Sequence, residues 1–152
     1  MDTDEYTLTE QILYDHADGT PARGEPISLD IDQILLHDVL GPLIWIEFEA
    51  LEYEAVQPDV VVQYADHQAY QLDARDTDTH RFLRTVTRKY GGHFSKPGAG
   101  ICHQIHRERF IEPGDTMIGC DSHSPTMGGF GAIGIGAGGL DVAVAMGGEP
   151  YT

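Results

Sequence analysis

Short apolar runs alternate along this chain with segments whose apolar residues recur every three or four positions, and this alternation restricts the fold more than any other feature. The runs predict strands and the periodic segments predict helices. Strands that alternate with helices favour an α/β domain with a mainly parallel sheet. The 152 residues contain no internal repeat and no linker, so one domain-sized unit is expected.

Four segments are predicted to be strands: the alternating residues 27–31, the β-branched run 60–62 that ends at Asp66-His67, residues 101–105, and residues 117–118 that lead into Asp121–His123. Helices are predicted over residues 7–17, 43–51, 79–90 and 140–146. Thr7 and Glu10 match a capping box at the start of the first helix. The glycine-rich stretch before the last helix is predicted to be a loop.

The charge balance excludes several classes of partner. With 25 acidic and 9 basic residues, the net charge of −16 disfavours nucleic acid and anionic membrane surfaces. The same excess of acid predicts a halophilic source, because concentrated salt screens the self-repulsion. No apolar run approaches the roughly 20 residues that span a bilayer. The acidic, polar amino terminus is unlike a signal or transit peptide, so a cytoplasmic protein is expected.

Three histidines, His67, His103 and His123, lie at or near the ends of short predicted strands, where open α/β sheets bind ligands. Asp66 and Asp121 lie close to two of them in sequence. A carboxylate beside an imidazole can fix its tautomer and favour proton transfer near neutral pH. Adjacent strand residues point to opposite faces, so contact between Asp66 and His67 requires a turn. A surface or packing role for each histidine remains the alternative.

Two other motifs have competing interpretations. Residues 129–134 match G-x-G-x-x-G, but residues 124–126 separate them from the preceding strand, which disfavours dinucleotide binding. Close backbone packing, or a wall around a small anion, are the alternatives. Cys120 and His123 have a plausible zinc spacing, with further ligand types at Cys102, His103 and His106. A zinc site is disfavoured because the chain has no CxxC pair and Cys102 and His103 would face opposite ways on a strand.

Several blocks together resemble one family of hydro-lyases over essentially the whole chain. These are G-I-C-H-Q at residues 100–104, D-S-H-S-P-T at 121–126 and G-I-G-A-G-G-L-D-V-A at 134–143, with TLTEQIL near the start and the Asp66-His67 block. The chain is similar to the aconitase and isopropylmalate dehydratase family, and GAGGLDVAVAMGGEPY looks most like the single-chain prokaryotic aconitate hydratases. The large subunit of 3-isopropylmalate dehydratase, or homoaconitase, is the alternative.

The resemblance implies a three-layer aconitase-type α/β domain, present here incompletely. Residues 1–152 would correspond to the N-terminal part of the first domain, without the cluster-cysteine region and later domains. It also implies reversible conversion of citrate to isocitrate through cis-aconitate, as in the tricarboxylic acid cycle. A [4Fe–4S] cluster with one open iron would act as a Lewis acid in the complete enzyme.

Site residues carry over by position. The resemblance implies five catalytic residues and two that bind a tricarboxylic or dicarboxylic acid substrate: Asp66, His67, His103, Asp121 and His123 for the first group, Ser122 and Thr126 for the second. Residues 38–42 depart from the family pattern, because Pro42 cannot donate a side-chain hydrogen bond.

Cys102 and Cys120 are not at the positions of the cluster cysteines, so this chain supplies no metal ligand and is expected to bind no cluster alone. We therefore expect it to be inactive by itself. Its expected partners are the missing C-terminal domains or a complementing chain. A non-catalytic truncated gene product, or a partner subunit, is the alternative of another class.

Overall fold

A computed structural model of the protein describes residues 6–17, 19 and 22–152. Five parallel strands form one open sheet in the order β3-β2-β1-β4-β5. Their bounds are Gln33–Leu36 for β1, Val60–Tyr64 for β2, His93–Ser95 for β3, Thr116–Gly119 for β4 and Ile133–Gly136 for β5. The predicted α/β class with a parallel sheet is confirmed. Residues 1–5, part of the acidic start on which a cytoplasmic location was expected, lie outside the described residues.

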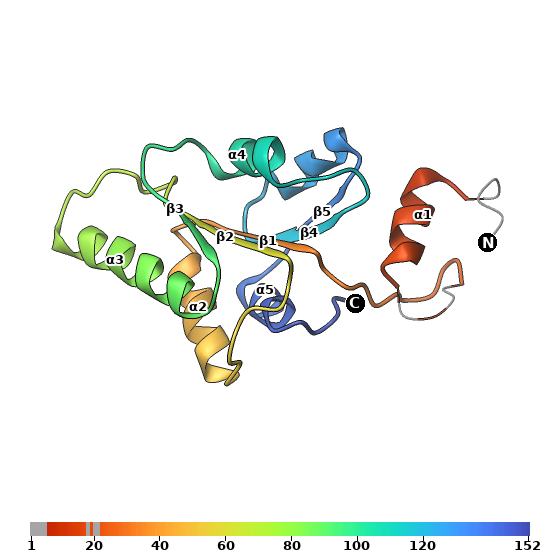
Figure 1. Ribbon diagram of the computed structural model, residues 1–152, viewed down its shortest axis with the longest axis horizontal. Coiled ribbons are helices and arrows are strands. Elements are labelled where there is room, and N and C mark those ends of the chain that lie inside the picture. The colour runs from red at the N-terminus through yellow and green to blue at the C-terminus, as the bar shows by residue number, and fades with distance from the viewer. Residues whose placement is uncertain (1–5, 18, 20–21) are drawn as a thin grey trace.

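Helices cover both faces of the sheet and give three layers (Figure 1). On one face lie α2 (Gly41–Ala50), α3 (Ala74–Lys89) and α5 (Gly139–Met146), and on the other lie α4 (Cys102–Arg109) and the 3-10 helix η2 (Ser124–Phe130). The short α1 (Leu8–Asp15) lies beside the sheet. The chain runs from β1 outward to β3 and then returns to β4 beyond β1. Right-handed crossovers therefore put α2 and α3 on one face and α4 on the other.

Each face of the sheet carries its own apolar core. Ile34 and Leu36 point toward the side of α2, where Trp45 and Phe48 are buried, while Leu35 points toward the α4 side and packs with Met117 and Met127. All these side chains are buried, as expected for a parallel sheet covered on both faces. Within the described ranges, no helix is both long and apolar enough to cross a membrane.

The predicted helices are confirmed, with shifted ends, as α1, α2, α3 and α5. The capping box of α1 is present, with Thr7 accepting from the Glu10 amide. Helix α3 begins five residues before the predicted start, because Asp73 and Asp76 form a second capping box there. The predicted strands at residues 60–62 and 117–118 are confirmed as β2 and β4.

The predicted strand at residues 27–31 is wrong. Leu29 makes only isolated antiparallel bridges, to Ala17 and Tyr151, and the true strand β1 follows at Gln33–Leu36. All four residues of β1 are buried. Residues 34–36 are a continuous apolar run, as expected for a central parallel strand covered on both faces, and the prediction followed the alternation at residues 27–31 instead.

The predicted strand at residues 101–105 is also wrong, because this segment begins helix α4. Its buried residues Cys102 and His106 are four positions apart, which is a helical spacing. No side chain at the N-cap, Ile101, caps the helix, so the usual local start signal is missing. The glycine-rich loop is a partial error as well, because it contains η2 and the edge strand β5.

Candidate active site

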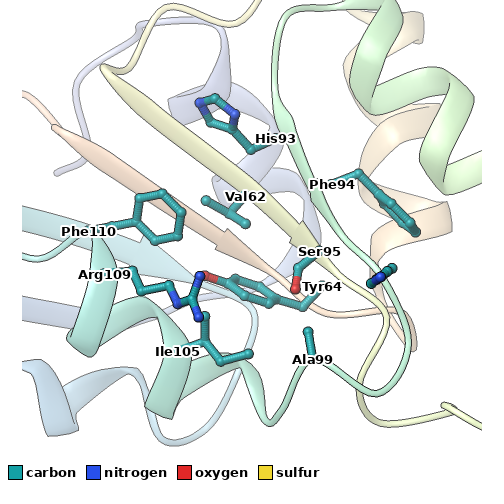
Figure 2. Close-up of a pocket in the computed structure, with 10 residues that line it drawn as sticks. Val62, Tyr64, His93, Phe94, Ser95, Ala99, Ile105, Arg109 and Phe110 are labelled. Atoms are coloured by element: carbon teal, nitrogen blue, oxygen red, sulfur yellow. The ribbon is translucent and has the colours of Figure 1, made fainter.

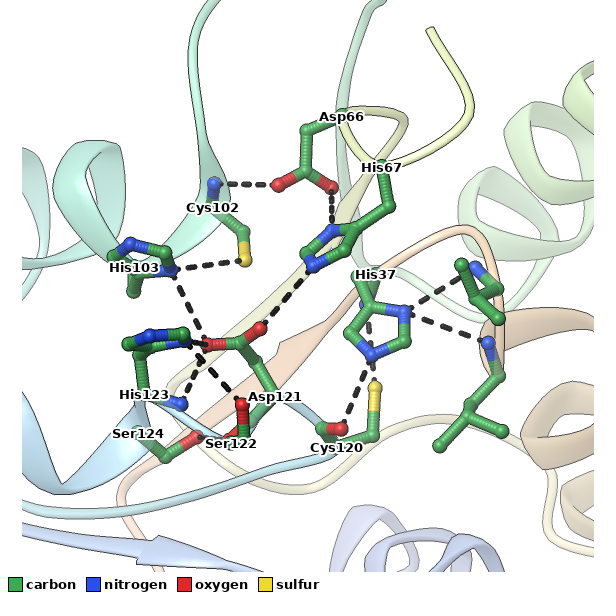
Figure 3. Close-up of polar contacts among 12 residues, drawn as sticks. His37, Asp66, His67, Cys102, His103, Cys120, Asp121, Ser122, His123 and Ser124 are labelled. Carbon is green, nitrogen blue, oxygen red and sulfur yellow. Dashed lines mark hydrogen bonds and ion pairs between the residues drawn. The ribbon is translucent and has the colours of Figure 1, made fainter.

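The carboxyl ends of β1, β2 and β4 place polar segments side by side at one edge of the sheet (Figure 3). His37 and Asp38 follow β1, Asp66 and His67 follow β2, and residues 120–123 follow β4. The chain direction reverses here, since β2 lies on one side of β1 and β4 on the other. Such switch points are where open α/β sheets bind ligands.

One buried carboxylate, Asp121, lies at the centre of the cluster. Its Oδ2 is 3.3 Å from His67 Nε2, and its Oδ1 is 3.2 Å from His103 Nδ1 and 3.6 Å from His123 Nδ1. The same Oδ1 accepts from the His123 amide at 2.9 Å. The rings of His103 and His123 stack with centroids 4.6 Å apart. The Asp121 side chain is 3% exposed, so its charge is shielded from water and acts mainly on these three imidazoles.

Asp66 fastens the start of α4 to the end of β2. Its Oδ2 accepts a 2.6 Å hydrogen bond from the Cys102 amide, and its Oδ1 lies 3.2 Å from His67 Nδ1. The chain turns after Asp66, so the contact with His67 that a straight strand would forbid does form. A carboxylate at a helix N-terminus supplies the cap that α4 lacks locally.

Asp38 holds the turn that carries His67. Its two carboxylate oxygens accept from the amides of His67 and Gln68, each at 3.0 Å. Asp38 is 1% exposed. Residues 38–42 were singled out as a departure from the family pattern, and the structure gives Asp38 this bracing role while Pro42 lies in the first turn of α2.

His37 belongs to the cluster and was missed by sequence reasoning. Its ring lies 4.4 Å from that of His67, its Nδ1 accepts from the Val39 amide, and its Nε2 is 3.1 Å from the Cys120 carbonyl. Nε2 must then donate, so the ring is held neutral. Burial lowers the pKa of His37, and the nearby His67 lowers it further. The signal was available: a strand predicted at residues 33–36 would have made His37 another strand-end histidine.

The two thiols are buried at the same edge. Burial, and then Asp66, raise the pKa of Cys102, and burial raises the pKa of Cys120 to about 12. Cys102, His103 and Asp121 have ligand atoms within 4.8 Å of one another. Cys102 and His103 are the first two residues of helix α4, so the predicted opposite orientation of their side chains on a strand is wrong. Burial nevertheless favours the neutral thiols over the thiolates that a metal requires.

The remaining predicted residues lie on the exposed side of the cluster. Ser122 Oγ is 3.3 Å from His123 Nδ1, and the Thr126 hydroxyl donates to the His123 carbonyl at 2.7 Å. His106 points away from the cluster into the core, where it contacts Tyr64 and Gln33. The sequence thus grouped His106 with candidate ligands that the structure separates from it.

The glycine motif at residues 129–134 runs from η2 into β5, so it lacks the strand-to-helix context of a dinucleotide site. A Cβ at Gly134 would overlap the carbonyl oxygen of Ser124. This glycine therefore permits the close packing of η2 on β5.

Comparison with known proteins matches this chain to members of one family of enzymes. The model of the aconitase family (aconitate hydratase) matches residues 10–152. The chain is 36% identical over 140 residues to the 3-isopropylmalate dehydratase large subunit 2 of Archaeoglobus fulgidus, covering 92% of this chain and 34% of that protein. It is 35% identical over 162 residues to the mitochondrial aconitate hydratase of Gracilaria gracilis, covering 95% and 20% respectively. For the mitochondrial homocitrate dehydratase of Saccharomyces cerevisiae the identity is 33% over 168 residues, covering 95% and 21%. The chain thus spans between a fifth and a third of the length of these relatives.

Proposed function

Because the chain belongs to the aconitase family, we propose that it provides the proton-transfer part of a hydro-lyase site that interconverts citrate and isocitrate through cis-aconitate. The observation that supports this most is the convergence of three imidazoles on the buried Asp121 carboxylate. The relatives named 3-isopropylmalate dehydratase and homocitrate dehydratase supply the competing substrates.

Elimination of water from a hydroxy acid needs a proton on the departing oxygen, because hydroxide is a poor leaving group. His103 suits this role best. Its Nδ1 faces Asp121, which leaves Nε2 to face a substrate, and only 17% of its side chain is exposed. A carboxylate on one ring nitrogen fixes the tautomer and stabilises the imidazolium. His123 has the same arrangement in a more exposed position, with Ser122 beside it.

His67 has a different role in this proposal. Both of its ring nitrogens face carboxylates, Nδ1 toward Asp66 and Nε2 toward Asp121. It therefore links the two acids and positions Asp121. Ser122 and Thr126 lie at the exposed side of the imidazoles. The Ser122 hydroxyl can donate to a substrate carboxylate there, whereas the Thr126 hydroxyl must first release the His123 carbonyl to do so.

The residues of this chain do not fit the [4Fe–4S] cluster that the family resemblance implies. A cluster is held by several cysteine thiolates, and the chain contains two cysteines, both buried and both favoured as neutral thiols. We propose that the cluster cysteines come from outside these 152 residues. Three of the similar proteins are named as large subunits, which suits a site completed by further polypeptide.

The test is binding of the candidate substrates to the full chain, followed through the histidine ring signals by NMR. Citrate and isocitrate should shift the rings of His67, His103 and His123. His103→Gln should weaken that binding by about tenfold, the equivalent of one charge-assisted hydrogen bond. The matched control His93→Gln, on the exposed edge strand β3, should change it by less than about twofold.

Tighter binding of 3-isopropylmalate or homocitrate than of citrate would move the assignment to that substrate. If none of these acids shifts the three rings, the proposed site is wrong.

A further inference from the structure

A cavity of about 480 Å³ lies between α3 and the loop that follows β3. Three basic side chains line it, Arg81 and Arg84 from α3 and Lys96 from the loop. Arg81 and Arg84 are three positions apart and so lie on the same face of the helix. Phe94 forms part of an apolar wall.

The gathering of positive charge here is unusual for this chain. Of only 9 basic residues, three line this one cavity, and none of the three makes an ion pair with a described residue although the chain has 25 acidic ones. Arg23, Arg75 and Lys89 do pair with carboxylates, so three of the six cations that form no ion pair with a described residue line this cavity. A second hollow of about 340 Å³ shares Lys96 and Phe94 and adds Arg109 and Ser95 (Figure 2). The end of β3 is therefore a positive region on an otherwise acidic protein.

We propose that the cavity between α3 and residues 94–97 binds a small polyanion, a molecule with at least two negative charges carried by carboxylate or phosphate groups. Guanidinium groups bind either by paired N–H donors, and an ammonium group adds a compact charge. The neutral polar groups of the wall already bond to each other: Thr77 donates to Gln71 Oε1, and Gln71 Nε2 contacts His80 Nδ1. Arg81, Arg84 and Lys96 are therefore the polar groups of the wall that can bind a ligand.

The cavity is connected to the candidate active site through two buried residues. His80, whose side chain is 7% exposed, lies with Nε2 3.5 Å from Asp38 Oδ2 and makes no hydrogen bond there. Asp38 in turn accepts from the amides of His67 and Gln68. Gln71 comes from the segment that follows this turn. Binding in the cavity should therefore alter the environment of the His67 amide.

The experiment is an NMR titration of the full 152-residue chain at fixed ionic strength with two probes, sodium pyrophosphate and tricarballylate. Amide signals of residues 77–84 and 94–97 should shift and saturate. The His67 and Gln68 amides should shift with the same midpoint in the pyrophosphate titration, which is used for this readout because a tricarboxylate would also bind at the proposed active site beside His67. Arg81→Gln and, separately, Lys96→Gln should each weaken binding by about tenfold. The matched control Arg88→Gln, exposed on α3 outside the cavity, should leave the affinity within about twofold of wild type.

Saturation by both probes supports the site. Saturation by tricarballylate alone identifies a carboxylate ligand, and by pyrophosphate alone a phosphate ligand. The proposal is overturned if neither probe saturates these amides, or if Arg88→Gln weakens binding as much as Arg81→Gln. All three substitutions replace exposed side chains, and the dispersion of the amide spectrum confirms that each variant is folded.

Discussion

The Asp66 carboxylate lies 2.6 Å from the backbone nitrogen of Cys102, which is 36 residues further along the chain. This hydrogen bond joins the end of β2 to the first residue of α4. His103 is the next residue of that helix, so its position beside Asp121 depends on Asp66. The Asp66–His67 pair therefore helps to position the second pair, His103 and Asp121.

Loss of the Asp66 cap should destabilise the protein. Asp66→Ala is expected to lower the free energy of unfolding by about 1–2 kcal/mol, since it removes both a capping acceptor and a charge at a helix N-terminus. Urea unfolding followed by circular dichroism measures this. The control is Asp59→Ala, which removes an exposed carboxylate and should cost less than about 0.5 kcal/mol. Equal effects of the two substitutions would contradict the capping role.

Acid should destabilise the protein through His106. This ring is fully buried between the Tyr64 hydroxyl and Gln33 Oε1, and burial lowers the pKa of His106 to about 4. Between that value and the ordinary pKa of about 6.5, the unfolded chain binds a proton that the folded chain does not. The contribution is therefore fully present above about pH 6.5 and is lost as pH falls toward about 4. Lowering the pH from about 7.5 to about 5 should therefore reduce the free energy of unfolding by about 2 kcal/mol through this residue.

The variant His106→Phe should be less stable at neutral pH, because Tyr64 and Gln33 lose a hydrogen-bond partner. Its loss of stability between about pH 7.5 and about pH 5 should be smaller than that of the wild type by about 2 kcal/mol. Tyr64→Phe is the matched control, since it breaks the same hydrogen bond and keeps the imidazole. It should retain most of the pH dependence. A wild-type slope in His106→Phe would refute the assignment; residual slope is expected from His37, whose pKa is also lowered.

The 152-residue chain should form no iron–sulfur cluster by itself. After anaerobic reconstitution with iron and sulfide, we expect no charge-transfer absorption band, because its two buried thiols cannot replace the cysteine ligands of a cluster. A four-cysteine ferredoxin treated in parallel serves as the positive control. A stable brown protein with stoichiometric iron and sulfide would show that the two cysteines are ligands after all.

Salt should stabilise the fold. At a net charge of −16 the surface repels itself, and raising the salt from about 0.1 M to about 1 M shortens the screening length from roughly 10 Å to roughly 3 Å. The thermal midpoint measured by circular dichroism should rise over this range. Sucrose is the control, because it stabilises proteins by being excluded from their surface and does not screen charge. A rise with salt that exceeds the rise with sucrose is due to screening. Equal midpoints at low and high salt would count against a surface adapted to concentrated salt.

Local sequence determined much of this protein. The β-branched run of β2 and the amphipathic pattern of α3 predict their structures directly, because strand propensity and helical periodicity are properties of neighbouring residues. The same is true of the polar residues that follow β2 and β4. Asp66, His67 and Asp121 could therefore be identified as site candidates before any three-dimensional information.

Only the tertiary structure decided how these residues meet. Helix α4 takes its cap from Asp66, which no local pattern could reveal, and the alternating residues 27–31 form no strand because the sheet uses the buried run that follows them. The error at β1 concealed His37, and the error at α4 gave His103 a strand in place of the helix that carries it. Each was decided by contacts between residues tens of positions apart, whereas the sequence patterns report only on neighbours.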